Sequence, residues 1–596
     1  MADRVINDFS IRIATPNGTG STSANDIIFR ALFHMGLAPS AKNLFPSNIQ
    51  GMPTWFQIRV SPEGYQARRE NWEILLPLNP ETLAVDLDES RPGTVVLYNS
   101  DSPLADGREE ELVCYGLPLD TLARKNLKDA KLRPKLRNMI YVGALAELFG
   151  IPHDSVRAGI RSVFKKDKVV DVNWEACQLG VDYVRENLPK RDPYSFETAT
   201  QTDGKILIDG NEAAALGSIF GGCTFVAWYP ITPASSLTEA FIPHAEQLRT
   251  IGDGTRRVAV IQAEDELAAI GMALGAGWSG ARAMTATSGP GVSLMAENMG
   301  FGYFAEIPAV LFDVQRVGPS TGMPTRTQQS DLLQVAFLSH GDTRFPMLFP
   351  ATPAEAFEFS WRAFDAAERL QSPVVVMSDL DLGMNTWVDR ELEYPDRPFD
   401  RGKVLSDEKL AELESWGRYR DVDGDGIPWR SLPGRMETPR AAYFTRGSGH
   451  DESARYTERA DKYSANLDRL ARKIDGAPAH LPAPEFTGHS DAEVGLLAFG
   501  SSHSPILEAL DRVPDARVGY LRVRSWPFHD EVESFLARSE RVVVVEQNQQ
   551  GQMAALLKID FPQHAAKIES ALYYGGLPLS AAFVVENALE PLRKGQ

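Results

Sequence analysis

Residues 257–291, RVAVIQAEDELAAIGMALGAGWSGARAMTATSGPG, decide the fold of this chain. The run RVAVIQ is typical of a strand, EDELAAIGMALGAGWSG of a helix of small apolar residues, and RAMTATSGPG of a second strand that ends in a glycine-rich loop. The following VSLMAENMGFGYFA and PAVLFDVQR repeat the helix and the strand. Strands and helices that alternate in this way indicate a parallel sheet, so we predict a doubly wound α/β domain.

The same alternation extends from this unit towards both ends of the chain. Upstream, DFSIRIATPNGTGSTSANDIIFRALFHMGL predicts a strand, a glycine-rich loop and a helix; FQIRV, TLAVDL and TVVLYNS predict strands and IYVGALAELFGI a buried helix, all in a second parallel sheet. Downstream, VGLLAFGSS, ARVGYLRV and RVVVVEQ predict the strands of a smaller α/β domain.

Three α/β domains suit the length of the chain, because a single core stops growing beyond about 250–300 residues. We expect them at residues 1–190, 200–400 and 486–596. A polar linker is predicted at 188–205, and an irregular, charged connecting segment at 401–485 with a helix in ARYTERADKYSANLDRLARKID.

The composition is that of an acidic protein with an ordinary apolar content. Its 596 residues carry a net charge of −19, which argues against nucleic acid or an anionic membrane as the main partner. No apolar run approaches the roughly 18 residues of a membrane-spanning helix, and MADRVINDFS lacks the apolar core of a signal peptide. We therefore expect a cytoplasmic protein.

The three cysteines, Cys114, Cys177 and Cys223, are far apart in the sequence, and no C-x-x-C occurs. A disulfide framework, a zinc knuckle and a four-cysteine iron–sulfur site within this chain are therefore excluded. We expect all three to be buried small hydrophobes.

The segment YPITP, residues 229–233, follows the apolar run CTFVAW. Pro230 and Pro233 fix φ, remove two backbone donors and restrict the residue before each of them, so the strand cannot continue and the loop is stiff. Ligands of a doubly wound sheet bind beyond the carboxyl ends of its strands. Thr232 is therefore either a pre-positioned donor to a ligand or part of a structural turn.

Charged residues mark two further strand and helix boundaries. Arg316 comes directly after PAVLFDVQ and precedes the loop VGPSTGMPTRT; its guanidinium is either a clamp for a carboxylate or phosphate or a surface arginine. Glu264, Asp265 and Glu266 begin a predicted helix, where they either complement the helix dipole or include one buried carboxylate that exchanges a proton. The loop SGPG after RAMTAT either presents backbone N–H groups to an anion or is only a tight turn.

An acidic repeat lies in the connecting segment. Asp421, Asp423 and Asp425 have the D-x-D-x-D-G spacing of a calcium loop, but the twelfth position is Leu432, where such a loop needs Glu. Both a Ca²⁺ or Mg²⁺ site and a simple acidic turn stay open.

Taken together, four segments resemble the α subunit of the 2-oxoacid:ferredoxin oxidoreductases: GNEAAALGSIFGG, YPITPASSLTEAF, QAEDELAAIGMALGAGWSGARAMTATSGPGVSLMAENMGF and RVGPSTGMPTRTQQSDLL. The resemblance is greatest to the 2-oxoglutarate type whose γ domain is fused to the N-terminus. IRIATPNGTGSTSA and FPSNIQGMPTWFQIRVS resemble that γ domain, and RSWPFHDEVESFL and VVVVEQNQQGQ resemble the transketolase C-terminal-like domain of the family. A pyrimidine-type thiamine diphosphate domain is implied between them. The loop NGTGST departs from the family's G-x-G-G-Q-G, so a ligand role for it does not carry over.

The resemblance implies the reversible oxidative decarboxylation of 2-oxoglutarate to succinyl-CoA and CO2, with reduction of ferredoxin. It implies coenzyme A as cosubstrate and a β subunit that holds thiamine diphosphate, Mg²⁺ and a [4Fe–4S] cluster, in an (αβ)2 assembly. The residues agree: the family's diphosphate site needs Gly-Asp-Gly and an Asn roughly 25–30 residues later. The first Asn after Gly254 is Asn298, and the first after Gly426 is Asn466. Neither spacing fits.

The resemblance also assigns roles to individual residues. Glu266 matches the glutamate that contacts the aminopyrimidine ring of the cofactor and exchanges a proton with it. Thr232 matches the threonine that bonds the substrate carboxylate, and Arg316 the arginine near that carboxylate and the path of coenzyme A. Arg326 or the β subunit would supply a second cation for a dicarboxylate. The further residues expected to bind substrate or coenzyme A are Tyr229, Pro230, Ile231, Ser320, Thr321 and Arg326.

Two alternatives stay open. The same chemistry on pyruvate, branched-chain or aryl 2-oxoacids would use the same architecture. A non-catalytic scaffold subunit would keep the loops without using them.

Overall fold

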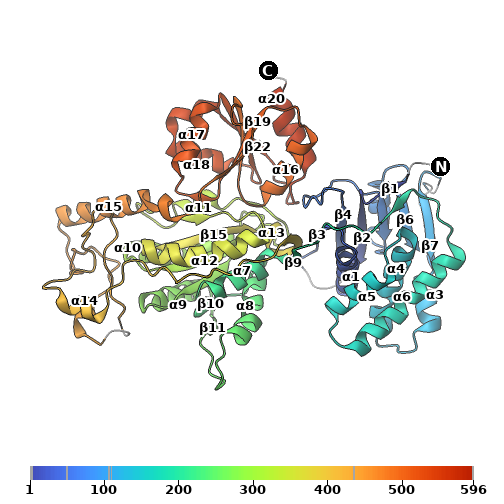
Figure 1. The fold of residues 1–596 in the computed structure, drawn as a ribbon, viewed down its shortest axis with the longest axis horizontal. Helices are drawn as coiled ribbons and strands as arrows, with labels where there is room; N and C mark the ends of the chain where they lie inside the picture. Colours follow the sequence, from blue (N-terminus) through green and yellow to red (C-terminus); the bar gives the residue numbers. More distant parts are fainter. Residues whose placement is uncertain (1–3, 48–51, 105–107, 109, 434–436, 594–596) are drawn as a thin grey trace. The chain divides into compact units, whose positions relative to one another are not determined.

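The computed structural model describes residues 4–593 apart from 48–51, 105–107, 109 and 434–436. The chain forms two compact units. Unit 1 comprises Met1–Leu207 with the short segments Asn385–Glu391 and Ser580–Ala582, and unit 2 comprises the rest. Strands and helices alternate in both units (Figure 1), which confirms the predicted α/β class. Part of FPSNIQGMPTWFQIRVS, residues 48–51, lies outside the described residues.

Unit 1 is built on a six-stranded sheet in the order β3-β4-β2-β5-β6-β7. The predicted parallel arrangement holds from β2 to β7, but β4 is antiparallel to both β2 and β3. The prediction of an all-parallel sheet is wrong at this edge, because the short connection from β3 to β4 cannot hold the crossover that parallel strands need. The main elements are β1 Val5–Ile6, β2 Phe9–Pro16, α1 Ser21–His34, β3 Ser40–Leu44, β4 Pro53–Val60, β5 Ile74–Pro77, α2 Leu83–Asp88, β6 Val95–Asn99, β7 Val113–Leu117, α3 Leu119–Asn126, α4 Arg133–Phe149, α5 His153–Val163, α6 Asp167–Asn187, β8 Tyr194–Ser195 and β16 Thr386–Arg390.

The segment TLAVDL, predicted as a strand, is the short helix α2. Its centre is Asp86, whose carboxylate is fully buried. The Thr82 hydroxyl and the Trp55 indole N–H each donate to that carboxylate over 2.7 Å. A buried carboxylate held by a donor four residues upstream favours a helical turn, which the alternation of apolar residues did not reveal.

The predicted linker at 188–205 is hydrogen-bonded along unit 1. Phe196 N–H donates to the Phe149 carbonyl over 2.7 Å and Gln201 N–H to the Gly36 carbonyl over 2.8 Å. Cys177 and Cys223 are buried as predicted, whereas Cys114, on the edge strand β7, is only partly buried. In the part of the chain that the structure describes, no helix is both long and apolar enough to cross a membrane.

Unit 2 contains a seven-stranded sheet in the order β11-β10-β12-β13-β15-β14-β20. The chain passes from β10 outwards to β11 and then back across β10 to β12, so the strand order reverses between β10 and β12. Helices α7, α8 and α12 pack together, and α9 packs with α10 against the sheet. The elements are β9 Lys205–Asp209, α7 Gly210–Phe220, β10 Phe225–Trp228, α8 Ser235–Leu248, β11 Ala259–Gln262, α9 Glu266–Trp278, β12 Ala283–Thr287, α10 Gly289–Phe304, β13 Ala309–Gln315, α11 Leu332–Ala336, β14 Met347–Leu348, α12 Pro353–Leu370, β15 Pro373–Asp379 and α13 Leu380–Met384.

The C-terminal part of unit 2 adds a five-stranded sheet in the order β17-β19-β18-β21-β22, parallel except for β17. Strand β20, which follows β19 in the chain, is not part of this sheet and pairs antiparallel with β14 at the edge of the central sheet. The predicted boundary at residue 486 stays a prediction. The elements are β17 Glu485–Gly488, β18 Val494–Ala498, α16 His503–Arg512, β19 Val518–Arg522, β20 Ser525–Trp526, α17 Asp530–Arg538, β21 Arg541–Glu546, α18 Gln552–Asp560, β22 Ile568–Leu572, α19 Ala581–Val584 and α20 Glu590–Arg593.

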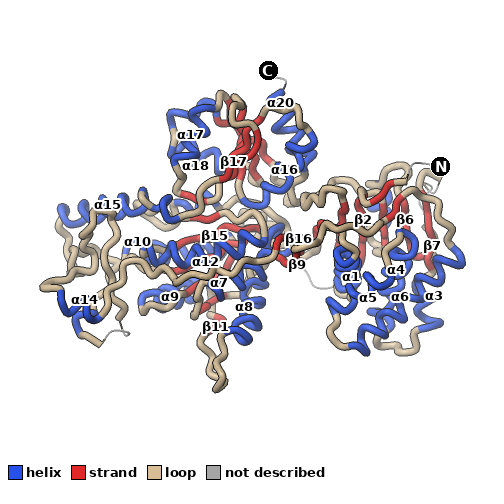
Figure 2. The backbone as a smooth tube through the Cα atoms, viewed as in Figure 1, coloured by secondary structure: helices blue, strands red, loops and turns tan. Residues whose placement is uncertain are grey.

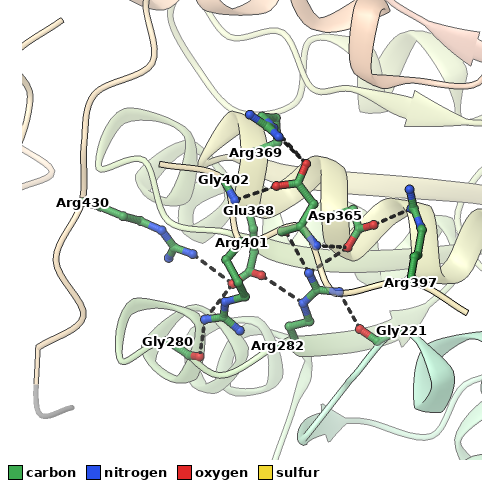
Figure 3. Close-up of polar contacts among 11 residues, drawn as sticks. Gly221, Gly280, Arg282, Asp365, Glu368, Arg369, Arg397, Arg401, Gly402 and Arg430 are labelled. Carbon is green, nitrogen blue, oxygen red and sulfur yellow. Dashed lines mark hydrogen bonds and ion pairs between the residues drawn. The ribbon is translucent and has the colours of Figure 1, made fainter. Parts of the chain in front are cut away.

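The connecting segment is mostly loop, with α14 Asp407–Glu412 and then α15 Ala460–Asp475 (Figure 2). A buried ion network fixes it to the central sheet (Figure 3). Glu368 of α12 accepts from Arg282 over 2.9 Å, and Arg401 and Arg430 of the connecting segment pair with its other oxygen at 3.0 and 2.9 Å. Asp365, one turn earlier, accepts from Arg282 over 2.7 Å. These pairs give the irregular segment a fixed attachment.

The acidic loop of the connecting segment is organised by a lysine. The Lys403 ammonium lies 2.7 Å from Asp423 and 2.8 Å from Asp425, and Asp421 accepts from two backbone N–H groups. Among the described residues, no group of three or more His, Cys, Asp or Glu that could hold a metal is found. The Lys403 amino group thus balances the charges of two of the three aspartates, which favours the acidic turn.

Candidate active site

The carboxyl ends of three neighbouring strands carry the predicted site residues. Thr232 follows β10, the SGPG loop follows β12, and Arg316 follows β13. Strand order reverses between β10 and β12, which is where ligands of doubly wound sheets bind. A cavity of about 710 Å³ opens at the ends of β12 and β13 and is lined by Arg316, Ser320 and Thr321 together with Gly289 and Pro290 of α10.

Arg316 and Thr232 are in direct contact. Nη1 of Arg316 donates a hydrogen bond of 2.7 Å to the backbone carbonyl oxygen of Thr232. The arginine is only 8% exposed, and burial lowers its pKa, while Asp331 acts in the opposite direction. The predicted convergence of the two loops is thus present, but the contact uses the backbone of Thr232 and leaves the partly exposed side chain to other partners.

The loop after Arg316 closes on itself. Val317 and Met323 form an isolated antiparallel bridge, and Gly322 between them has a φ of 52°. A Cβ at Gly322 would lie 1.9 Å from the Val317 carbonyl oxygen, so a larger residue does not fit. This closed loop places Ser320 and Thr321 in the cavity wall.

Glu266 is the first residue of α9, and its side chain is 93% buried, since the residue is 7% exposed. Asp265 caps the helix by accepting from Ala268 N–H over 2.7 Å, and Glu264 is exposed. Of the three acids only Glu266 is buried, and of the other two only Asp265 caps the helix. A Cβ at Gly291 would lie 2.9 Å from Glu266 Cγ and 2.0 Å from Thr287 Oγ1. The glycine therefore allows the side chains of Thr287 and Glu266 to pack directly against the backbone at the start of α10.

Thr232 and Glu266 are not among the residues that line the cavity, and four other predicted residues also lie outside it. Tyr229 and Pro230 are exposed, Ile231 is half-buried, and none of them is among the residues that line it. Arg326 donates from Nη1 to the Thr325 carbonyl over 2.8 Å, and it is also absent from the cavity wall. The roles predicted for these four residues stay predictions.

One wall of the cavity comes from a segment to which the sequence assigned no site residue. Asn548, Gln549, Gln550 and Gln552, from the QNQQGQ loop after β21, line it with Tyr574. The loop is joined to the central part of unit 2: Asn548 donates to the Gln329 carbonyl over 3.0 Å, and Gln552 to the Ser330 carbonyl over 2.7 Å. The only sign of this wall in the sequence was the run of amide side chains directly after a predicted strand.

The residue that anchors the YPITP turn is Asn211, which no motif in the sequence had marked. Asn211, at the start of α7, is buried and donates from Nδ2 to the Pro233 carbonyl over 2.9 Å and to the Ser236 hydroxyl over 2.7 Å. The prolines stiffen the turn, and this asparagine ties it to the neighbouring helix.

The side chains at the site fit the aminopyrimidine end of thiamine diphosphate and not its diphosphate end. The buried carboxyl of Glu266, at the start of α9, suits the aminopyrimidine ring. The acidic loop is filled by Lys403, and the cysteines Cys114, Cys177 and Cys223 do not gather at any one place. A magnesium ion, a diphosphate group and an iron–sulfur cluster therefore find no matching ligand set among the residues that the structure describes.

Comparisons with known proteins agree with this organisation. Residues 216–407 match the family described as pyruvate flavodoxin/ferredoxin oxidoreductase, thiamine diphosphate-binding, and residues 10–183 match pyruvate ferredoxin/flavodoxin oxidoreductase. The α subunit of 2-oxoacid:ferredoxin oxidoreductase 2 from Aeropyrum pernix is 32% identical, over 92% of this chain and 93% of the relative. The 2-oxoglutarate oxidoreductase subunit KorA of Mycobacterium tuberculosis is 29% identical, over 92% of this chain and 86% of the relative.

A solved structure is similar along almost the whole chain. It is the 2-oxoglutarate:ferredoxin oxidoreductase of Magnetococcus marinus, with 2-oxoglutarate, coenzyme A and succinyl-CoA bound. The identity is 28%, the TM-score is 0.87, and the match covers 98% of this chain and 99% of the other.

Proposed function

We propose a function from the premise that this chain belongs to the α subunits of the 2-oxoacid:ferredoxin oxidoreductases. The reaction that the site supports best is the oxidative decarboxylation of 2-oxoglutarate to succinyl-CoA and CO2, with reduction of ferredoxin. The α subunits of this family work within multi-subunit complexes. We assign to this chain the substrate-carboxylate and pyrimidine sides of an active site that a β subunit completes in the cytoplasm.

The observation that carries the proposal is the contact between Arg316 and Thr232 beside the cavity. It joins the ends of β10 and β13 and presents a buried guanidinium to a polar cavity large enough for a small organic acid. A guanidinium with little access to water binds a carboxylate strongly, because both of its hydrogen bonds are charge-assisted. The Nη1 bond to Thr232 fixes the plane of that fork.

Glu266 has a separate role on the pyrimidine side. Thiamine diphosphate, when bound, supplies the carbon nucleophile that attacks the 2-oxo group and accepts electrons after decarboxylation. The carboxyl of Glu266 holds or exchanges a proton at a pyrimidine ring nitrogen, since the first turn of α9 and the buried Thr287 shield it from water. Thr232 contributes its hydroxyl to the substrate carboxylate.

The apolar face of α9 supports a β subunit as the partner. After Glu266 this helix contains no charged residue, yet Leu267 and Met272 are exposed, as is Leu294 on the adjoining α10. Gly275 on the same face has no atom within 4 Å of the place where its Cβ would stand. An exposed apolar face beside the buried Glu266 suits a subunit that brings the rest of the cofactor site. An (αβ)2 assembly is the expected form.

Reconstitution with the co-expressed β subunit tests the proposed function. The complex is assayed for ferredoxin reduction with coenzyme A and, in turn, 2-oxoglutarate, pyruvate, a branched-chain and an aryl 2-oxoacid. We expect the largest kcat/KM with 2-oxoglutarate. If kcat/KM is larger for another acid, that acid is the substrate in place of 2-oxoglutarate. No turnover with any acid would favour a scaffold subunit.

A separate experiment identifies the cation that binds the distal carboxylate of 2-oxoglutarate. Arg326 and the β subunit are the two candidate sources. If Arg326 binds the distal carboxylate, Arg326→Gln raises the KM for 2-oxoglutarate and leaves that for a monocarboxylate unchanged. If the β subunit supplies the cation, both values stay as in the unsubstituted complex.

A further inference from the structure

Two adjacent carboxyl groups at the cavity are not used by the proposed reaction. Asp313 is on β13 and fully buried, and Asp331 directly precedes α11 and lines the cavity. Asp331 is half-buried, its Oδ2 atom is buried, and the two carboxyl groups are hydrogen-bonded to each other. Apart from this mutual bond, neither Asp313 oxygen nor Asp331 Oδ2 has a hydrogen-bond partner in the described part of the chain. Such a pair costs free energy unless it shares a proton, because two adjacent buried carboxylates repel.

The surroundings distinguish the two members. A Cβ at Gly289, the first residue of α10, would lie 2.7 Å from Asp331 Oδ2, so this carboxyl lies at the positive end of a 16-residue helix. Arg316 also acts on Asp331. Asp313 is enclosed between β12 and β15, opposite Thr287 and Met377. Asp313 therefore keeps the proton, and Asp331 is the member that ionises.

The pKa values agree with this assignment. Burial, and then Asp331, raise the pKa of Asp313 well above its ordinary value. Burial raises the pKa of Asp331 to about 7, against the opposing effect of Arg316. The other charged groups on the elements packed against β13 and α11 are Glu266 of α9, Glu297 of α10, Asp379 of β15, Asp381 of α13, Lys558 and Asp560 of α18, and Glu355, Glu358, Arg362, Asp365, Glu368 and Arg369 of α12. None of them contributes to these shifts.

We propose that Asp331, backed by Asp313, is a positioning residue that couples the binding of a carboxylate at Arg316 to the uptake of one proton by the carboxyl pair. Without a ligand, ionised Asp331 balances the charge of Arg316. An anion bound to Arg316 brings a second negative charge into the same cavity, and the pair takes up a proton from solvent to remove the repulsion. By linkage, the anion binds more tightly as the pH falls, by at most about tenfold per pH unit for one proton.

This inference rests on the proposed anion-binding role of Arg316, and its test does not depend on turnover. Glutarate, a five-carbon dicarboxylate without the reactive 2-oxo group, is titrated into the complex with the β subunit by isothermal calorimetry. The titration is repeated near pH 7 in buffers of different ionisation enthalpy, which gives the number of protons taken up per bound anion. We expect a fraction of one proton near pH 7, and tighter binding at about pH 6 than at about pH 8.

Three isosteric variants make the test specific. Asp331→Asn should abolish proton uptake and make the glutarate affinity independent of pH. Asp313→Asn should retain uptake, because its amide still donates to the Asp331 carboxylate. Asp342→Asn, at an exposed position, is the matched control and should bind and take up protons like the unsubstituted chain.

Several outcomes would overturn the inference. They are no binding of glutarate, equal heats in all buffers for the unsubstituted chain, and undiminished uptake in Asp331→Asn. Uptake lost in Asp313→Asn but kept in Asp331→Asn would overturn the assignment of Asp331. Absent glutarate binding and equal heats in all buffers are both measured on the unsubstituted chain, so a folding defect of a variant cannot mask them. Proton-coupled binding in a complex without turnover on any 2-oxoacid would refute the proposed function and leave this inference standing.

Discussion

Arg316 Nη1 lies 2.7 Å from the carbonyl oxygen of Thr232, so a side chain at the end of β13 holds the backbone turn at the end of β10. The two residues are 84 positions apart in the sequence. Their contact makes the stiff YPITP turn and the cavity wall one structure. A change at either residue should therefore alter the binding of substrate more than the stability of the fold.

Arg316→Lys tests the guanidinium itself. The substitution keeps the positive charge but loses the planar fork, so we expect the KM for 2-oxoglutarate to rise about 10- to 100-fold, the range for a lost charged hydrogen bond. Steady-state kinetics of the reconstituted complex measure it. Arg256→Lys, at an exposed surface pair with Glu246, is the matched control and should leave KM unchanged. If both substitutions change KM equally little, Arg316 does not bind the substrate.

Glu266→Gln tests the proton-exchanging carboxyl. The amide fills the same space but cannot give up or take a proton in the same way, so we expect kcat to fall about 10²- to 10⁴-fold with little change in KM. Glu264→Gln is the control on the same loop, because Glu264 is exposed. Turnover of Glu266→Gln within a few-fold of Glu264→Gln would contradict the assignment.

Substitutions at two glycines of α9 distinguish an effect on folding from an effect on the subunit interface. A Cβ at Gly275 meets no atom within 4 Å, whereas at Gly277 it would lie 2.0 Å from the Pro308 carbonyl oxygen. Gly275→Ala should stabilise the chain alone by roughly 0.5–1 kcal/mol through helix propensity, and weaken its association with the β subunit. Gly277→Ala should destabilise the chain alone.

Thermal unfolding of the isolated chain and the Kd for the β subunit measure the two effects of these substitutions. If Gly275→Ala leaves that Kd unchanged, the exposed face of α9 is not the interface.

The buried Glu306 gives the chain a defined acid sensitivity. Burial alone would raise its pKa, but Arg469, Lys473 and Arg418 outweigh burial and hold it at about 2, below the ordinary 4.5. A depressed pKa stabilises the fold at pH values above about 4.5, and this contribution is lost as the pH falls from there towards 2. At about 1.4 kcal/mol per pKa unit, the contribution is on the order of 3 kcal/mol.

Urea unfolding between about pH 5 and pH 3 measures this dependence. Glu306→Gln should flatten the curve in that window and lower the stability at neutral pH, because it leaves three buried cations without their carboxylate. Asp342→Asn, at an exposed position, should keep the slope. If the Glu306→Gln curve of unfolding free energy against pH is shifted but keeps the same slope, Glu306 is not the source of the pH dependence.

Local patterns were sufficient wherever one segment determines its own structure. Helix α9 and the strands on either side of it were predicted from apolar spacing and glycine position. TLAVDL was mispredicted because the decisive interaction, Trp55 to Asp86, comes from a distant strand. The direction of β4 was missed for a related reason: parallel and antiparallel pairing depend on the connection, and alternating apolar residues look alike in both.

The sequence by itself determined the α/β class, the family, and which residue types stand at the ends of β10, β12 and β13. These properties follow from local periodicity, from proline and glycine positions, and from motifs that are contiguous in the chain. Only the tertiary structure decided that Arg316 meets the backbone of Thr232, that QNQQGQ forms a cavity wall, and that Asp313 and Asp331 share one site. Burial and charge coupling depend on distances in space, and residues far apart in sequence carry no local mark of them.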